Sequence, residues 1–295
     1  MHTWQAVILG LVEGITEYLP VSSTGHLIIA SDLMGLGKAP GEKAALDAFN
    51  VVIQGGAILA VLGLYFPRFV QMFRGLLGRD PAGLRLFINV VIAFIPAAVV
   101  GLLSKAWIEA HLFSIGPVVA ALIVGGVFMI VIDIVFIRRQ RAAAAITAGA
   151  GGMDVDALTP GRALIIGLLQ ILSLWPGTSR SMMTISGGVM VGLRPAAAAE
   201  FSFLLGMPIL VAATGFSLFK NLRESAKAGT PNLFEVVGYT PAIVGIVVAA
   251  VSAALAVRWL VGFLNRHGLT PFGIYRIALG VTLLALAMGG IVTVD

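Results

Sequence analysis

The sequence predicts an all-α integral membrane protein with about six transmembrane helices and two re-entrant helix-loop-helix segments in an inverted-topology repeat. Three observations predict this fold class: the composition, a series of long apolar windows, and one order of segments that occurs twice. Of the 295 residues, 59% are hydrophobic and 11% are charged, and the mean hydropathy is +1.01. Soluble domains carry about 25% charged residues. The composition therefore excludes an ordinary water-soluble globular protein.

Long apolar windows recur along the chain and are the expected membrane spans. They cover residues 48–66, 87–103, 115–137, 201–219, 236–264 and 272–292. Each is close to or longer than the roughly 17–25 residues that a helix needs to cross a bilayer. Because backbone groups in lipid must form their hydrogen bonds within the chain, a helical bundle is the expected architecture.

Composition and charge exclude several classes of function. The chain has no cysteine, which excludes disulfides, thiolate metal sites and a cysteine nucleophile. Its net charge of +5 comes without a long Lys/Arg run, so no nucleic-acid partner is expected. The first ten residues lack a basic region and a small-residue cleavage site, so we expect no cleavable signal peptide. Arginines gather in residues 67–84 and 138–162, which predicts that these connections are cytoplasmic and both termini are outside.

One order of segments occurs twice, which predicts a first repeat (1–137), a cytoplasmic linker (138–160) and a second repeat (161–295). Each repeat begins with a polar segment interrupted by proline and continues with three apolar windows. Because three is an odd number of spans, the second repeat must enter the membrane from the opposite side. Inverted repeats of this kind place a site near the bilayer midplane at their interface. Chance similarity between apolar segments is the alternative.

Two polar stretches interrupt the apolar sequence, "EGITEYLPVSSTGH" at residues 13–26 and "PGTSRS" at residues 176–181. Proline lacks the amide that a helix interior needs, so each stretch should break a helix. Hydroxyl residues of the N-cap type follow the prolines: Ser22, Ser23, Thr24, Thr178 and Ser179. Non-helical backbone at membrane depth must line a cavity, so we expect the two loops to meet inside the bundle.

Two glutamates in the first stretch predict a bound cation. Glu13 and Glu17 lie four residues apart, so a helix would carry both carboxylates on one face. Each ionised carboxylate at the bilayer centre costs roughly 2.5–3.5 kcal/mol, so the pair needs compensation. Mg²⁺ is commonly held by one or two carboxylates together with substrate phosphates, and Ca²⁺ also takes oxygen ligands. A pair that reaches water at the membrane edge is the alternative.

The second stretch has the features of an anion site. A helix N-terminus offers free amides and a positive dipole end, and the planar guanidinium of Arg180 suits phosphate oxygens. Ser181 adds a hydroxyl. Together with two carboxylates and a divalent cation, these groups fit a diphosphate at membrane depth. A structural ion pair between Arg180 and a glutamate is the alternative.

The remaining polar residues of the apolar sequence have weaker assignments. A serine at the start of the first half-helix, flanked by glutamates and His26, is a candidate nucleophile. Helix packing with a bond to a carbonyl is the alternative for His26. Gln54 and Gln170 are interpreted either as groups near the substrate or as helix–helix hydrogen-bonding residues. Arg276 lies near the end of its window, so we expect it to anchor at the membrane interface.

The two stretches resemble the signature motifs of the bacterial undecaprenyl-diphosphate phosphatases of the bacitracin-resistance type. "FNVVIQGGAILAV" at residues 49–61 and "AAEFSFLLGMPILV" at residues 198–211 extend the resemblance, which runs from about Trp4 to Ala287. The resemblance implies removal of the terminal phosphate of undecaprenyl diphosphate at the outer face of the bacterial cytoplasmic membrane, with a divalent cation. The product is the lipid carrier that is recycled for cell-wall assembly.

The resemblance also implies roles for individual residues. The matched positions are Glu13 and Glu17 for metal and catalysis, Ser22, Ser23 and His26 for the Ser/His part, and Arg180 for phosphate. We take Ser23 as the nucleophile and Glu17 or His26 as the acceptor of its proton, while attack by His26 or by water is left open. The expected substrate contacts are Ser22, Thr24, Thr178, Ser179, Arg180, Ser181 and Gln54.

A secondary transporter or lipid flippase is the competing function, because inverted repeats, broken helices and midplane carboxylates are typical of transporters too. The residues alone do not separate the two functions, and the family resemblance favours the enzyme. The expected partners are a polyprenyl-diphosphate lipid and membrane lipids, with a homodimer as one assembly that the sequence allows.

Overall fold

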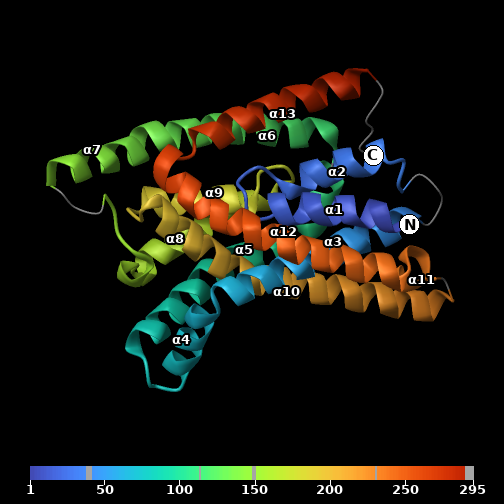
Figure 1. Cartoon of the computed structure of the whole chain (residues 1–295), viewed down its shortest axis with the longest axis horizontal. Helices are drawn as coiled ribbons and strands as arrows, with labels where there is room; N and C mark the ends of the chain where they lie inside the picture. Colours follow the sequence, from blue (N-terminus) through green and yellow to red (C-terminus); the bar gives the residue numbers. More distant parts are fainter. Residues whose placement is uncertain (38–41, 113, 148–150, 230, 290–295) are drawn as a thin grey trace. The chain divides into compact units, whose positions relative to one another are not determined.

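The computed structural model describes residues 1–37, 42–112, 114–147, 151–229 and 231–289 (Figure 1). Within these ranges the regular structure is helical, apart from one isolated bridge between Met153 and Leu193. The chain forms two compact units. The first consists of Met1–Tyr18, Ser23–Leu64 and Met207–Val257, and the second of Leu19–Ser22, Tyr65–Gly206 and Arg258–Asp295. Each unit therefore draws on both halves of the sequence.

Within the described ranges, the predicted membrane spans are confirmed as six helices that are long and apolar enough to cross a bilayer. They are α3 (Glu42–Leu64), α5 (Pro81–Leu112), α6 (Ile115–Ile132) with its continuation, α10 (Pro195–Ala228), α12 (Tyr239–His267) and α13 (Thr270–Met288). Residues 290–292 of the last predicted window lie outside the described residues. The chain is thus a multi-pass membrane protein.

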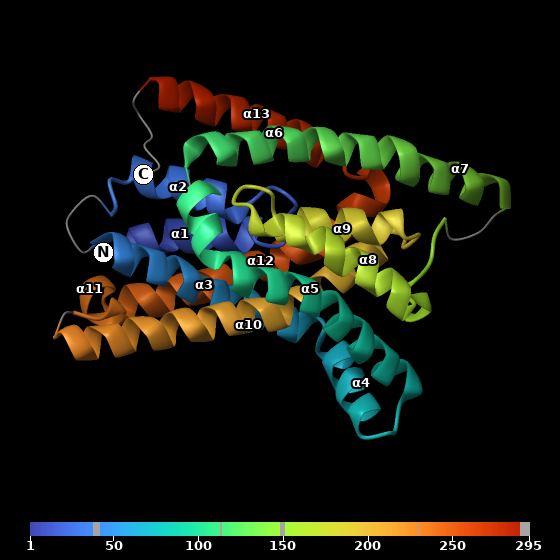
Figure 2. The same ribbon diagram turned by 180° about the vertical axis from the view of Figure 1, so that it is seen from behind.

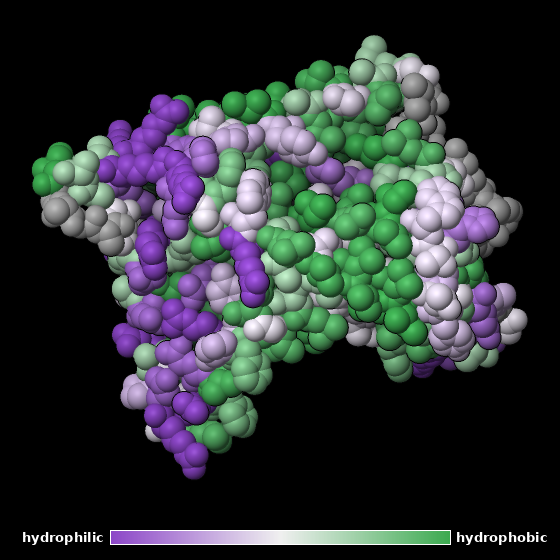
Figure 3. All heavy atoms as spheres, viewed as in Figure 1, coloured by the Kyte–Doolittle hydropathy of each residue, from purple (hydrophilic) through white to green (hydrophobic). Residues whose placement is uncertain are grey.

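The outer surfaces of these helices are suited to lipid. On α12 the exposed side chains Ile243, Val247, Val251 and Leu255 recur every four residues and form one apolar stripe. Figure 3 shows hydrophobic side chains over α13 and the middle of α12, and hydrophilic ones over α7 (Arg138–Thr147) and the end of α4 (Phe66–Leu76). An apolar outer stripe at helical spacing is what a helix presents to hydrocarbon.

The first unit holds residues 13–18 and 23–26 of the first proline-containing stretch, while residues 19–22 belong to the second unit. The first unit contains α1 (Thr3–Thr16), α2 (Ser23–Leu33), α3, the second part of α10, α11 (Leu233–Val237) and most of α12. Its core is built from buried apolar side chains of α1, α3 and α12, among them Leu9, Phe49 and Ile53. Small residues let α1 approach α12 closely: a Cβ on Gly10 would lie 2.6 Å from the Gly245 carbonyl oxygen.

Replacing Gly14 by alanine is expected to destabilise this unit. A Cβ at Gly14 would overlap Ser252 Oγ and the Ala249 carbonyl oxygen on α12, so the helices must separate at a cost of about 1–3 kcal/mol. The matched control is Gly63→Ala, because a Cβ at Gly63 on α3 meets nothing within 4 Å. The measurement is the thermal unfolding midpoint in detergent. Equal midpoints for the two variants would contradict the close packing of α1 on α12.

The second unit holds the second stretch on a helix pair, α8 (Pro160–Gln170) and α9 (Arg180–Met190), linked by a 3₁₀ turn at Ile171–Leu174 and a loop. Beside them are α4 and α5, which form a hairpin, and α6 and α13, which run side by side (Figure 1, Figure 2). Gly126 of α6 and Gly273 of α13 make this pairing close, because a Cβ on either would lie 2.6 Å from the other's carbonyl oxygen.

Part of the segment that the sequence assigns to a linker is helical. After α6 the chain passes through a π-helical turn, Asp133–Ile137, and continues as α7, whereas residues 148–150 lie outside the described ranges. Asp133 is buried, and its Oδ2 accepts hydrogen bonds from the amides of Leu269 at 2.9 Å and Thr270 at 2.7 Å. Asp133 therefore fixes the start of α13.

Both proline-containing stretches form the expected helix-loop-helix. The first helix of each pair is short: α1 has 14 residues and α8 has 11, which corresponds to about 21 Å and about 17 Å at 1.5 Å per residue. Neither length reaches across the roughly 30 Å hydrocarbon core of a bilayer. The lengths agree with segments that enter and leave from one side, and this re-entrant placement stays a prediction, as does the inverted repeat.

Candidate active site

The carboxylate part of the candidate site lies at the end of α1 in the first unit. Glu13 is fully buried, and Glu17, the first residue after α1, is 9% exposed. The amide of Glu17 donates to the Glu13 carbonyl oxygen at 2.9 Å, so helical geometry continues to Glu17. Ser23, the first residue of α2, donates from Oγ to Glu17 Oε2 at 2.8 Å. The predicted nucleophile and a predicted catalytic carboxylate are therefore in direct contact.

The chain around this contact is held by α3. Tyr18 is fully buried, and its hydroxyl donates to the Ala57 carbonyl oxygen at 3.0 Å. Gln54 lies one turn before Ala57 on the same helix and is half-buried. On α2, His26 is half-buried one turn after Ser23, while Thr24 is exposed. Sequence reasoning did not single out Tyr18, although a tyrosine in an apolar segment signals a hydroxyl that needs an acceptor.

The loop part of the candidate site lies in the second unit, which contains residues 19–22 of the first motif and the loop 175–179 that enters the second motif. Ser22 has φ 73° and Ser179 has φ 74°, and among the described residues they are the only non-glycine residues with positive φ. Each directly precedes a helix, α2 or α9. A left-handed serine costs of order 1–3 kcal/mol and persists only where surrounding contacts hold it. The two motifs thus share an unusual backbone conformation at matching positions.

Ser181 connects the two loops. Its Oγ donates to the Leu19 carbonyl oxygen at 2.8 Å and lies 3.0 Å from Ser179 Oγ. Ser179 Oγ in turn accepts from the Met182 amide at 3.3 Å, which confirms the N-cap predicted for α9. Thr178, in the same loop, is buried. The predicted meeting of the two loops is present within this unit.

Arg180, the first residue of α9, is held against α10. Its Nη1 donates to the Ser202 carbonyl oxygen at 3.1 Å, and its guanidinium lies against Gly206, where a Cβ would come within 2.5 Å of Cζ. Glycine at position 206 therefore provides the space for this side chain. Thr184 and Ser202, whose hydroxyl oxygens are 2.6 Å apart, pack beside it on α9 and α10.

The expectation for Arg276 was wrong. The sequence places it at the membrane interface, but the structure buries its side chain fully in the second unit. The guanidinium donates to three backbone carbonyl oxygens: Gly177 at 2.8 Å, Ala121 at 3.0 Å and Pro20 at 3.5 Å. A signal was present in the sequence, since Gly273 and Gly280 lie three residues before and four after it. Small residues on that face indicate close packing against another helix rather than exposure.

The donor set for a metal is small. Among the described residues no group of three or more His, Cys, Asp or Glu side chains could hold a metal ion. Glu13 and Glu17 supply carboxylate oxygens from one face of α1, the donor type that Mg²⁺ and Ca²⁺ prefer. Two carboxylates fit a cation that takes its remaining ligands from substrate phosphates and water, as Mg²⁺ commonly does.

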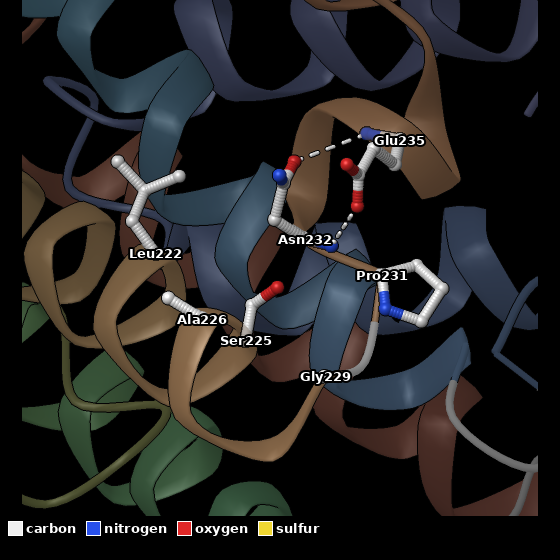
Figure 4. A pocket seen from close by; sticks show the side chains of 7 residues that line it. All are labelled: Leu222, Ser225, Ala226, Gly229, Pro231, Asn232 and Glu235. Carbon is white, nitrogen blue, oxygen red and sulfur yellow. Dashed lines mark hydrogen bonds between the residues drawn. The ribbon is translucent and has the colours of Figure 1, made fainter.

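A separate hollow in the first unit lies between α10 and α11 and contains none of the predicted site residues (Figure 4). It is lined by Leu222, Ser225, Ala226, Gly229, Pro231, Asn232 and Glu235. Asn232 Oδ1 accepts from the Glu235 amide at 3.2 Å, and Glu235 Oε2 accepts from the Asn232 amide at 2.8 Å. This reciprocal pair is a capping box, so Asn232 and Glu235 are explained by the start of α11.

Comparisons with known proteins cover nearly the whole chain. The family model described as bacitracin resistance protein BacA matches residues 6–282. An undecaprenyl-diphosphatase of Sorangium cellulosum is 47% identical over 97% of this chain and 87% of its own length. An undecaprenyl-diphosphatase of Geobacillus kaustophilus is 42% identical over 96% of this chain and 97% of its own length. A Rhodospirillum rubrum protein named undecaprenyl-diphosphatase 2 is 44% identical over 98% of this chain and 96% of its own length.

Proposed function

Because the chain belongs to the bacitracin resistance protein BacA family, we propose that it is an undecaprenyl-diphosphatase, a membrane hydrolase that converts undecaprenyl diphosphate into undecaprenyl phosphate and inorganic phosphate. The identity of 47% and 42% to two proteins of that name, over nearly the whole chain, supports undecaprenyl diphosphate as the substrate. The observation that carries the chemistry is the 2.8 Å hydrogen bond from Ser23 Oγ to Glu17 Oε2. A hydroxyl paired with a carboxylate that can take its proton is the arrangement of an activated nucleophile.

The proposed reaction has two steps. Ser23 Oγ attacks the terminal phosphorus, its proton passes to Glu17, and the bond from that phosphorus to the bridging oxygen breaks. Undecaprenyl phosphate leaves, and a phosphoserine is formed. Glu17 passes this proton to the departing undecaprenyl phosphate and is a carboxylate again. Water then attacks the phosphoserine, Glu17 accepts a proton from the water, and the bond from phosphorus to Ser23 Oγ breaks. The proton on Glu17 returns to Ser23 Oγ as inorganic phosphate leaves. His26, one turn further along α2, is the second candidate for the proton acceptor or the attacking group.

The remaining proposed roles concern charge. Phosphoryl transfer depends mainly on positioning and on charge stabilisation. We assign Arg180 and the free amides at the start of α9 to the phosphate oxygens, because helix N-termini and guanidinium groups both favour such anions. Thr178, Ser179 and Ser181 add hydroxyls in the same loop. Ser22, Thr24 and Gln54 are further proposed substrate contacts.

A divalent cation, Mg²⁺ or Ca²⁺, is proposed to be held by Glu13 and Glu17. When bound, it would neutralise charge on the diphosphate and so remove its repulsion by the carboxylates. The burial of Glu13 supports this assignment, because a nearby positive charge stabilises the ionised form of a fully buried carboxyl group. We place the protein in the bacterial cytoplasmic membrane, with the site open to the outer face. This placement is based on the family and on the arginines of residues 67–84 and 138–162.

Phosphate release from a polyprenyl diphosphate in detergent tests the proposed function. We expect release with Mg²⁺ or Ca²⁺, at least about tenfold less after chelation with EDTA, and recovery when the cation is restored. Detergent micelles hold no gradient and no second compartment, so a transporter or flippase would show nothing there. Activity confined to sealed vesicles would therefore favour transport and contradict the proposal. Release that is unchanged by EDTA would contradict the cation site alone.

A further inference from the structure

Arg276 has no part in the reaction as proposed so far, yet its position is costly. The side chain is fully buried, and within the described residues no carboxylate forms an ion pair with it. Burying a guanidinium without a carboxylate is unfavourable unless its donors are well bonded. An apolar residue would fill this place on α13 without that cost. The presence of arginine is therefore explained by what its two terminal nitrogens, Nη1 and Nη2, bind.

Its donors bind matching points of the two motif loops. Pro20, whose carbonyl oxygen accepts at 3.5 Å, lies two residues before Ser22. Gly177, whose carbonyl oxygen accepts at 2.8 Å, lies two residues before Ser179. The two serines are the left-handed residues that lead into α2 and α9. One side chain on α13 thus holds both loops at equivalent places.

Arginine is suited to this task because its planar guanidinium presents five donors in fixed directions. Here it binds carbonyls of three segments, the third being Ala121 on α6 at 3.0 Å. Lysine has a flexible stem and a single point of donation, so it cannot reproduce the three directions. Gly125 leaves the space for the guanidinium, since a Cβ there would lie 2.6 Å from Nη2.

The helices that carry Arg276 and the second loop are themselves fixed. Asp133 accepts from the amides of Leu269 and Thr270 at the start of α13. Trp175 ties the second loop to α6, because its Nε1 donates to the Pro117 carbonyl oxygen at 3.0 Å. Gly177 has φ 90°, and a Cβ there would lie 2.8 Å from the Val118 carbonyl oxygen. These contacts hold α13, α6 and the second loop in place, so the surrounding segments cannot easily rearrange when the guanidinium is removed.

We propose that Arg276 is a positioning residue: from α13 it holds the Pro20 and Gly177 carbonyls, so that both motif loops keep the conformation that leads into Ser23 and Arg180. This inference rests on the proposed function for its effect on turnover. A reactive group displaced by about 1 Å can lose about 100-fold in rate. The substrate itself is not touched by Arg276 in this proposal, so its affinity should change little.

The kinetic test compares Arg276→Lys, Arg276→Met and Gly125→Ala with two controls. Gly116→Ala adds a methyl to the same helix α6 where nothing lies within 4 Å, and Arg258→Lys changes an exposed arginine. With farnesyl diphosphate in detergent, we expect kcat to fall about 100-fold for both Arg276 variants and about tenfold for Gly125→Ala, with KM within about threefold. Both controls should stay within about twofold of the wild type.

Two further measurements separate positioning from plain stability. Unfolding midpoints should show that Arg276→Lys and Gly125→Ala are folded at the assay temperature. These two variants therefore test the proposal even if Arg276→Met does not fold. Hydrogen exchange should show residues 19–22 and 175–179 becoming less protected together in Arg276→Lys. Protection unchanged in both loops, or kcat retained with a raised KM, would overturn the proposal. If the wild type releases no phosphate, the proposed function is contradicted. The hydrogen-exchange experiment would still test whether Arg276 holds the two loops.

Discussion

Replacing Ser23 by alanine is expected to reduce phosphate release by at least about 1,000-fold while the protein stays folded. The substitution removes the hydroxyl that donates to Glu17 Oε2 at 2.8 Å, and with it the oxygen that we propose attacks phosphorus. Ser23 is half-buried at the first position of α2, so loss of one oxygen leaves the helix packing intact. The measurement is inorganic phosphate released from a polyprenyl diphosphate in detergent, together with the unfolding midpoint.

Ser31→Ala is the matched control for this experiment. Ser31 lies on the same helix and is buried, and within the described part of the chain its Oγ has no hydrogen-bond partner. Its loss should leave turnover unchanged. Acid quenching of the wild type during turnover of a substrate labelled in the terminal phosphate should trap a labelled phosphoserine, which Ser23→Ala cannot form. Activity retained in Ser23→Ala would remove it as the nucleophile, and the absence of trapped label would favour direct attack by water or by His26.

The second large effect is expected for Glu17→Gln, a change that preserves shape and removes charge. The glutamine oxygen can still accept the hydrogen bond from Ser23, but it cannot take a proton or balance a cation. General-base catalysis contributes about 100–10,000-fold, so we expect kcat to fall within that range. The Mg²⁺ concentration for half-maximal activity should also rise. Titration of activity with Mg²⁺ for the wild type and the variant measures both effects.

Glu13→Gln separates the two roles of Glu17. Glu13 is fully buried one turn earlier on α1, whereas the Ser23 hydroxyl donates to Glu17. We therefore expect a raised Mg²⁺ requirement with kcat largely recovered at saturating Mg²⁺. Glu224→Gln is the control for charge removal, since Glu224 is exposed and its oxygen lies 3.9 Å from Lys220 Nζ. Turnover within about threefold of the wild type in Glu17→Gln would refute its role as proton acceptor.

Much of the fold could be predicted because its causes are local. The apolar windows became α3, α5, α6, α10, α12 and α13, since an apolar run of sufficient length has few alternatives to a membrane helix. Pro20 and Pro176 predicted the helix breaks for an equally local reason, the missing amide. Ser179 was predicted as an N-cap, and its Oγ accepts from the Met182 amide.

The contact between Ser23 and Glu17 was within reach of the sequence as well, because both residues flank one short turn. The left-handed conformation of Ser22 and Ser179 was not. Serine has no intrinsic preference for positive φ, so only the contacts around each loop can impose it. The same holds for Ser181, whose partner is a main-chain carbonyl of a residue far away along the chain.

The sequence by itself determined the membrane class, the positions of the spans, the two motifs and the family to which the chain belongs. Only the tertiary structure decided that Arg276 is buried, and that its acceptors are the carbonyls of Pro20, Ala121 and Gly177. The physical reason is that the length of an apolar segment and the break at a proline depend only on the residue types in that segment. A backbone carbonyl is present at every residue, so which carbonyls meet a guanidinium depends on how the segments pack.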